Sequence, residues 1–182
     1  MVIAGLDPSF SNFGFSKGTF INGYLEITQV SLQKTEKSKV KQVKVNSDDL
    51  YRATLLLKSI NDFLSGVDLV FIEVPQGSQS ASAAKAYGVC IGLIAGIKIP
   101  YIQVNPTQVK IAATGNKTAS KAEMINWAVD MYPELNWLTK KQKGLVSLTN
   151  DNEHIADSIA AIHAGLRSDT FKQLQAFQRT IS

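Results

Sequence analysis

Two short apolar runs in the chain each end on an acidic residue. Residues 2–7 read VIAGLD and end at Asp7, and residues 67–73 read VDLVFIE and end at Glu73. Apolar runs of this length are typical of buried strands. If the two strands are neighbours, both carboxylates project from the same end of the sheet, where function gathers in sheets covered by helices. The pattern therefore predicts two central strands that bring an acidic pair to one edge of the sheet.

A hairpin is predicted directly after the first run. Residues 12–20 and 23–32 have strand-like composition, and Asn22-Gly23 between them is a strong signal for a two-residue turn. Residues 37–45, KSKVKQVKV, roughly alternate lysine with valine, so we expect the third strand to continue through them. In that register one face of a charged ribbon carries Lys37, Lys39 and Lys41.

Helical spacing predicts most of the remaining chain. A helix capped by Ser47-Asp48-Asp49 is expected to end at Gly66. A second helix, over about residues 80–97, carries a stripe of small residues that packs on the sheet or admits a partner subunit: Ala84, Gly88, Gly92 and Gly96. The other predicted elements are a strand at 100–104, a helix at 105–115, a helix capped by Thr118 or Ser120 and closed by Pro133, a loop at 134–150, and a long helix from 150–152 to 166.

Length and composition fit one globular domain. The chain has 182 residues, of which 45% are hydrophobic, enough for a single sizeable core. The order of elements predicts an α/β fold, a mixed sheet of about five strands flanked by helices. We expect one domain over residues 1–182, in which 169–182 form an accessory C-terminal helix.

Other sequence features disfavour membrane and secretory classes. The apolar stretch at residues 86–97 is 12 residues long and contains glycines, so it is too short to span a bilayer. We expect no signal peptide, because Asp7 interrupts the apolar start, and the single Cys90 excludes a disulfide framework. We expect a cytoplasmic protein, in a bacterial or phage-infected cytosol or in an organelle interior after processing.

The charge distribution suits a polyanionic partner. The formal net charge is +4, which is modest. Five lysines, however, fall within residues 34–44 and three within 140–143. Each cluster is either a DNA-binding edge or solvated surface, and lysines on an edge strand also block unwanted strand pairing.

The last long helix offers two further chemical groups. His154 and Asp157 are three residues apart and share one helical face. This spacing is common, and a single histidine in a helix is usually structural. The same side of this helix is otherwise apolar, so both groups would be buried unsatisfied unless they meet polar partners. Carboxylates brought together repel one another, and protonation or a bound cation relieves the repulsion.

Five motifs, in family order, resemble those of the RuvC-type Holliday junction resolvases, which have an RNase H-like fold. They are GLDPSFSNFGF, FIEV, SASAAKAYGVCIGLIAG, the pair PTQVK and TASKAEM, and HIADSIAAI. The resemblance spans about residues 2–166. Each motif alone is a weak signal, whereas five in order are a strong one.

The resemblance implies roles for the matching residues. The implied metal ligands, also counted as catalytic, are Asp7, Glu73, His154 and Asp157. Lys121 matches a catalytic lysine near the nucleophile or the scissile phosphate, and Lys110 matches one that holds backbone phosphate. The expected DNA-binding set is Lys110, Lys117, Lys121, Lys37, Lys39 and Lys41.

The resemblance also implies the activity and its partners. Two divalent ions, Mg²⁺ or Mn²⁺, would support phosphodiester hydrolysis at each site, and the imidazole shifts the preference towards Mn²⁺. A homodimer would cut four-way DNA junctions by paired symmetric nicks. The expected partners are branched DNA and a second copy of the chain, with no membrane and no nucleotide cofactor.

Three features depart from the family pattern. Many members carry an acid where His154 stands, although a histidine variant exists. Residues 74–78, VPQGS, replace a segment that usually holds an aromatic wedge, and the lysine-rich 34–44 stretch is longer than usual, which fits an added DNA-binding edge in a compact phage-encoded relative.

Alternatives remain open at this point. One is a nuclease with looser selectivity that also cuts forks, flaps and three-way junctions, and another is a junction-binding module without turnover. ATPase and sugar-kinase domains also open with Asp followed by Gly after a strand. They need two such domains and a second glycine-rich phosphate loop, for which this chain is too short.

Overall fold

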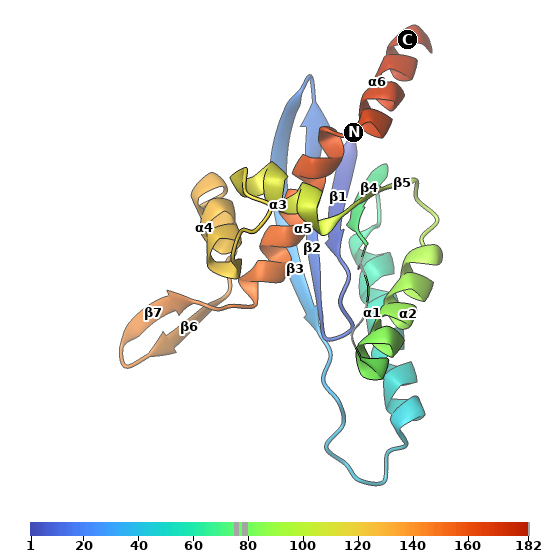
Figure 1. The fold of residues 1–182 in the computed structure, drawn as a ribbon, viewed down its shortest axis with the longest axis vertical. Helices are drawn as coiled ribbons and strands as arrows, with labels where there is room; N and C mark the ends of the chain where they lie inside the picture. The colour runs from blue at the N-terminus through green and yellow to red at the C-terminus, as the bar shows by residue number, and fades with distance from the viewer. Residues whose placement is uncertain (75–76, 78–79, 182) are drawn as a thin grey trace.

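The computed structural model describes residues 1–74, 77 and 80–181. It contains the predicted mixed sheet, with five strands in the order β3-β2-β1-β4-β5 (Figure 1). Three strands form an antiparallel meander: β1 (Val2–Asp7), β2 (Asn12–Ile21) and β3 (Tyr24–Lys34). On the other side of β1, β4 (Leu69–Glu73) and β5 (Tyr101–Val104) run parallel to it.

Helices cover both faces of this sheet (Figure 1). One face is covered by α1 (Val45–Phe63) and α2 (Ala81–Ala95). The other face is covered by α5 (Asn152–Leu166), on which α3 (Pro106–Thr114) and α4 (Lys121–Met131) pack in turn. The last helix, α6 (Asp169–Ile181), places the buried Phe171 ring against Phe20 and Phe71. The predicted α/β class is confirmed.

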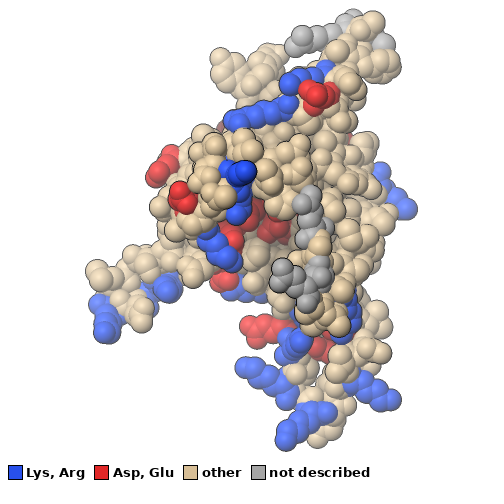
Figure 2. Space-filling view, in the orientation of Figure 1, with Lys and Arg blue, Asp and Glu red and all other residues tan. Residues whose placement is uncertain are grey.

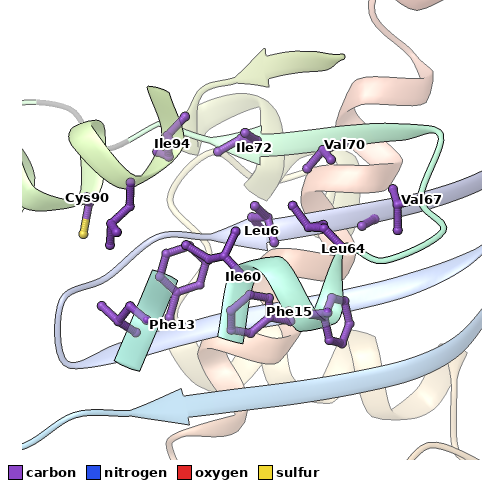
Figure 3. Packing of buried hydrophobic residues seen from close by; sticks show 14 of the residues in the cluster. Leu6, Phe13, Phe15, Ile60, Leu64, Val67, Val70, Ile72, Cys90 and Ile94 are labelled. Atoms are coloured by element: carbon purple, nitrogen blue, oxygen red, sulfur yellow. The ribbon is translucent and has the colours of Figure 1, made fainter. Parts of the chain in front are cut away.

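The core beneath α1 and α2 is built from the even-numbered residues of β1 and β4. Leu6 and Ile72 pack there with Phe13, Phe15 and Ile60, all almost fully buried (Figure 3). The Phe13 and Phe15 rings stack with centroids 4.7 Å apart. Each such side chain contributes roughly 1.5–3 kcal/mol by burial, so these contacts fix how the strands face.

Successive side chains of a strand point to opposite faces, so the odd-numbered residues of β1 and β4 face α5. Ile3 and Phe71 lie in the core on that side, together with Ile155, Ile159 and Ile162 of α5. Asp7 and Glu73 are odd-numbered positions of the same two strands, as Ile3 and Phe71 are. Both acids therefore lie on the face that α5 covers.

The predicted continuation of the third strand is wrong. β3 ends at Lys34, and Lys37, Lys39 and Lys41 lie on an exposed loop rather than on one face of a ribbon. A strand needs a neighbour and a buried face, but Val40 and Val43 are exposed and pair with no strand. The chain leaves the sheet after Thr35, whose backbone amide donates to the Ser11 carbonyl at 2.9 Å.

The predicted cap of α1 is also wrong. The helix begins at Val45 without a side-chain cap. Asp48 instead accepts a hydrogen bond from the backbone amide of Ser38 at 3.2 Å. Asp49 pairs with Arg52 and with Lys85 of α2. The two acids therefore join the helix to other segments rather than cap it.

Residues 134–150 contain a hairpin where a loop was predicted. It consists of β6 (Thr139–Gln142) and β7 (Leu145–Leu148), joined by a turn in which Lys143 and Gly144 have φ of 50° and 83°. The sequence has no buried apolar face here to reveal a strand, because every residue from Thr139 to Ser147 is exposed.

The small-residue stripe of α2 does not pack on the sheet. Ala84, Gly88, Gly92 and Gly96 all lie away from the core, and a Cβ placed on Gly88 or Gly92 would meet nothing within 4 Å. Of the two interpretations, packing on the sheet is therefore excluded. Within the described part of the chain, no helix is both long and apolar enough to cross a membrane.

Candidate active site

The acidic pair lies at the ends of two adjacent parallel strands. The ladder between β1 and β4 runs from Ile3–Leu69 to Leu6–Ile72, and Asp7 and Glu73 come immediately after its last pair. Apolar neighbours on both strands hold the backbone rigidly, so the two carboxylates leave the sheet at one place. This is the arrangement that the two apolar runs predicted.

Close approach of α5 to the sheet adds His154 and Asp157. A Cβ built on Gly14 would lie 2.0 Å from the carbonyl oxygen of His154, and one on Gly5 would lie 1.9 Å from that of Ser158. Only glycine leaves room for the helix backbone at these points. Gly14 is also the register partner of Asp7, so the contact that seats α5 lies beside the first acid.

Asp7 and His154 are in direct contact. His154 Nδ1 lies 2.6 Å from Asp7 Oδ2, and the two side chains are 23% and 15% exposed in that order. Burial lowers the pKa of His154, but the hydrogen bond and the charge of Asp7 outweigh it, so the pKa is raised overall. The contact with Asp7 therefore favours the protonated form of the His154 imidazole.

Glu73 and Asp157 hold protons more tightly than ordinary carboxyls. Burial, followed by the charge of Asp7, raises the pKa of Glu73 to about 8. Burial, then the charges of Asp7 and Glu73, raise the pKa of Asp157 well above its usual value. Three carboxyl groups and one imidazole thus share one partly buried space, where ionisation of all three carboxyls together is disfavoured.

Two lysines border the acids from α3 and α4. The charge of Lys110, which is half-buried, lowers the pKa of both Glu73 and Asp157. Lys121 is 73% exposed, and its Nζ lies 2.7 Å from Glu153 Oε2, a hydrogen bond that raises the pKa of Lys121. Figure 2 shows acidic side chains recessed near the middle of this face with basic side chains around them.

The remaining predicted DNA-binding lysines lie outside this cluster. Lys117 is exposed in the turn between α3 and α4. Lys37, Lys39 and Lys41 lie on the exposed loop that follows β3. The structure therefore brings together six of the predicted site residues, namely Asp7, Glu73, His154, Asp157, Lys110 and Lys121.

The donor set fits a divalent cation. Among the described residues, no group of three or more His, Cys, Asp or Glu side chains is arranged around a metal position, and Asp7 and His154 bond to each other. Burial and the charge of Asp7 disfavour ionised carboxylates at Glu73 and Asp157, and a bound cation would offset that effect. Oxygen ligands suit Mg²⁺ and Mn²⁺, and an imidazole favours the softer Mn²⁺.

Residues at the start of α5 have roles that the sequence did not indicate. Asp151 precedes the helix but makes no side-chain cap, and its carboxylate instead lies 2.5 Å from Lys34 Nζ. Asn152 is fully buried and its side chain bonds to Leu138 and Thr149. A short polar side chain at this position is typical of an N-terminal cap, but Asp151 and Asn152 make other contacts.

His163 is structural. It lies nine residues past His154, which at about 100° per residue puts it on the opposite side of α5. Its Nε2 lies 2.8 Å from the Tyr132 hydroxyl, and its ring meets the Trp127 ring edge-on. Burial lowers the pKa of His163 to about 4, with a smaller contribution from the charge of Arg167. The ring is therefore neutral in the folded protein near neutral pH.

Comparison with known proteins bears on this geometry. No protein-family profile matches the chain. Two curated relatives, the crossover junction endodeoxyribonucleases RuvC of Prochlorococcus marinus strains MIT 9303 and NATL1A, are 26% and 25% identical over 129 residues. Each match covers 69% of this chain and 80% of the relative. The chain is similar to RuvC.

Solved RuvC structures share the fold. The Thermus thermophilus RuvC structure has a TM-score of 0.60 and 20% identity, and the match covers 90% of this chain and 92% of that one. The same protein in complex with Holliday junction substrate also has a TM-score of 0.60, at 18% identity. The RNase H-like, RuvC-type fold implied by the five motifs is confirmed. The departure at residues 74–78 falls mostly outside the described residues.

Proposed function

We propose that the chain is a divalent-metal-dependent endonuclease that resolves four-way DNA junctions by paired symmetric nicks as a homodimer. The observation that carries the proposal is the convergence of Asp7 and Glu73, at adjacent strand ends, with His154 and Asp157 of α5. The similarity to RuvC, whose relatives are named crossover junction endodeoxyribonucleases, supports the reaction class.

Asp7, Glu73, His154 and Asp157 would hold two divalent ions, Mg²⁺ or Mn²⁺. Such ions supply an activated water and stabilise the leaving oxygen of an in-line phosphodiester hydrolysis. Asp7 would exchange its hydrogen bond from His154 for a ligand role. Glu73 and Asp157 would lose the protons that burial and mutual repulsion make them retain.

The two lysines would handle the phosphates. Lys121 is exposed at the rim and would approach the scissile phosphate once it leaves Glu153. Lys110 lies deeper, where its charge already acts on Glu73 and Asp157. It would hold a backbone phosphate beside the acids and so limit the repulsion between that phosphate and the carboxylates.

A homodimer would use the exposed stripe of α2. Gly88 and Gly92 leave open space, and Ile91 beside them is 45% exposed, so a second α2 can approach closely. Two-fold symmetry would then place two sites on strands of like polarity.

We also propose that residues 1–182 act as one nuclease domain with α6 as an accessory helix, in a bacterial or phage-infected cytosol.

The test is a nicking assay on matched substrates that share one sequence: a four-way junction, a three-way junction, a fork, a flap and a linear duplex. The proposal expects metal-dependent nicks at symmetric positions of the four-way junction and little cleavage of the duplex. Comparable cleavage of forks and flaps would favour the broader branched-DNA nuclease. Junction binding without nicks in Mg²⁺ or Mn²⁺ would instead favour a non-catalytic binding module.

A further inference from the structure

The β6–β7 hairpin projects from the body of the protein between α4 and α5 (Figure 1). Every residue from Thr139 to Ser147 is exposed, so neither face of this two-stranded ribbon packs on the core. Isolated two-stranded hairpins are marginally stable in water. A ribbon that contributes no core contacts and extends into solvent is available to bind another molecule.

Its side chains suit a polyanion. Lys140, Lys141 and Lys143 carry three positive charges, and residues 135–150 contain no acid. The register pairs Lys140 with Ser147 and Lys141 with Val146, so each face of the ribbon carries one lysine, and Lys143 lies in the turn. Figure 2 shows basic side chains on the projection.

The hairpin also carries exposed apolar groups. Leu145 is 75% exposed and Val146 is 67% exposed. Leu145 lies on the same face of the ribbon as Lys140, and Val146 lies on the same face as Lys141. Lysines next to apolar side chains suit a DNA backbone, where charged phosphates alternate with less polar sugars.

The base of the hairpin is fixed to the candidate active site. Asn152 is fully buried. Its Nδ2 donates to the carbonyl oxygens of Leu138 at 2.8 Å and Thr149 at 3.0 Å, and its Oδ1 accepts from the Leu138 amide at 2.9 Å. Asn152 lies two residues before His154 on α5. The hairpin is therefore held at a defined position relative to the acids.

A groove connects the hairpin to the rim of the site. It has a volume of about 380 Å³ and runs from Lys121 and Ile125 of α4 to Leu148 and Thr149 at the end of β7. Lys121 is the lysine that contacts Glu153, next to His154. The groove therefore joins Lys121, at the rim of the acids, to the end of the second hairpin strand.

We propose that the β6–β7 hairpin is a DNA-binding arm that holds the backbone of a duplex arm as it leaves the cleavage site. Lys140, Lys141 and Lys143 contact phosphates, and Leu145 and Val146 lie against the sugars. The assignment rests on the proposed nuclease function. Its lysines are separate from the predicted basic set at Lys37–Lys41.

The test compares two triple variants of the full chain: K140A/K141A/K143A in the hairpin and K37A/K39A/K41A in the loop after β3. Binding of a labelled four-way junction is measured by fluorescence anisotropy over a range of salt concentrations, without divalent ions. All six lysines are exposed, so both variants should fold, which circular dichroism checks.

For the hairpin variant, the slope of log K against log salt should fall by about 2.7, or roughly 0.9 for each phosphate that the variant no longer neutralises. Junction affinity should drop at least tenfold. If the hairpin variant binds the junction with unchanged affinity and salt slope, the proposal that the hairpin binds DNA is wrong. It is also wrong if the variant changes only the oligomeric state measured by sedimentation, which would indicate a protein-binding surface.

The same data separate this proposal from the nuclease proposal. If the wild type nicks junctions and the hairpin variant binds them with the wild-type affinity, the DNA-binding proposal is wrong and the nuclease proposal is supported. If neither protein nicks junctions but the hairpin variant binds them with a lower salt slope, the nuclease proposal is wrong and the DNA-binding proposal is supported.

Discussion

The carbonyl oxygen of His154 lies 2.0 Å from the position that a Cβ on Gly14 would occupy. Gly14 is paired with Asp7 across the β1–β2 ladder, and His154 bonds Asp7 directly. One glycine thus seats the helix that supplies two of the four candidate ligands. The backbone contact and the side-chain contact are two parts of one arrangement.

Gly14→Ala should displace α5 from the sheet. The added methyl cannot fit against the His154 carbonyl, so the free energy of unfolding should fall by about 3 kcal/mol, and junction nicking should fall by about 100-fold as the ligands separate. The matched control is Ser16→Ala on the same strand, because the Ser16 hydroxyl is buried without a hydrogen-bond partner and its removal should change stability little. The free energy of unfolding is measured by chemical denaturation. Equal free energies and equal nicking rates in the two variants would contradict the role of Gly14 in positioning α5.

His163 should make the protein sensitive to acid. Its pKa is about 4 in the folded state against 6.5 as its ordinary value, so the unfolded chain binds the proton first as the pH falls. Its contribution is full above pH 6.5 and is lost as the pH drops towards 4, by about 2 kcal/mol between pH 7 and pH 5. Denaturation of wild type and His163→Gln at both pH values checks this, and an identical loss in the two proteins would exclude His163 as the cause.

Glu73 should have the opposite pH effect when no metal is present. Its pKa is about 8 when folded against 4.5 ordinarily, so the folded state keeps the proton that the unfolded state releases. In chelator, the Glu73 contribution to stability should therefore decline from about pH 4.5 and level off above about pH 8. Glu73→Gln should flatten that decline, whereas Glu26→Gln, on the exposed side of β3, should not.

Divalent cations should oppose the loss of stability that Glu73 causes as the pH rises. Because a cation needs the deprotonated carboxylates, Mg²⁺ or Mn²⁺ should raise the melting temperature more at about pH 8 than at about pH 5. Glu73→Gln should weaken this effect. A metal-induced shift that is the same at both pH values, or is unchanged in Glu73→Gln, would remove Glu73 from the ligand set.

His154 should set the metal preference. Mn²⁺ should support nicking at least as well as Mg²⁺, because an imidazole shifts preference towards Mn²⁺. His154→Asp should narrow the difference between the two metals by making all four ligands carboxylates. The measurement is the ratio of nicking rates in the two metals. An unchanged ratio in His154→Asp would show that His154 does not bind the ion.

The site could be predicted from the sequence where local pattern and tertiary contact agree. The apolar runs before Asp7 and Glu73 form central strands because both of their faces are buried. The helical spacing of His154 and Asp157 holds because α5 packs its apolar side on the sheet. Gly5, which lets α5 approach, gave only the weak signal of a glycine inside a strand.

The errors fall where no core contact supports the local pattern. The lysine–valine alternation at 37–45 has the period of a strand, but this segment pairs with no described strand. Residues 139–148 form strands without an apolar face, stabilised by their mutual ladder and by the tether at Asn152. The α1 cap was misplaced because Asp48 and Asp49 bind other segments. Such interactions depend on the assembled fold and leave no local trace.

The most direct test of the central claim is four-way junction cleavage by wild type and Asp7→Asn in Mg²⁺ and in Mn²⁺, with junction affinity measured in parallel. Asp7 lies among all three other candidate ligands, so Asp7→Asn should abolish nicking and leave the dissociation constant for the junction within about threefold of wild type. Nicking by Asp7→Asn at the wild-type rate, or a wild type that binds the junction and never nicks it, would contradict the claim.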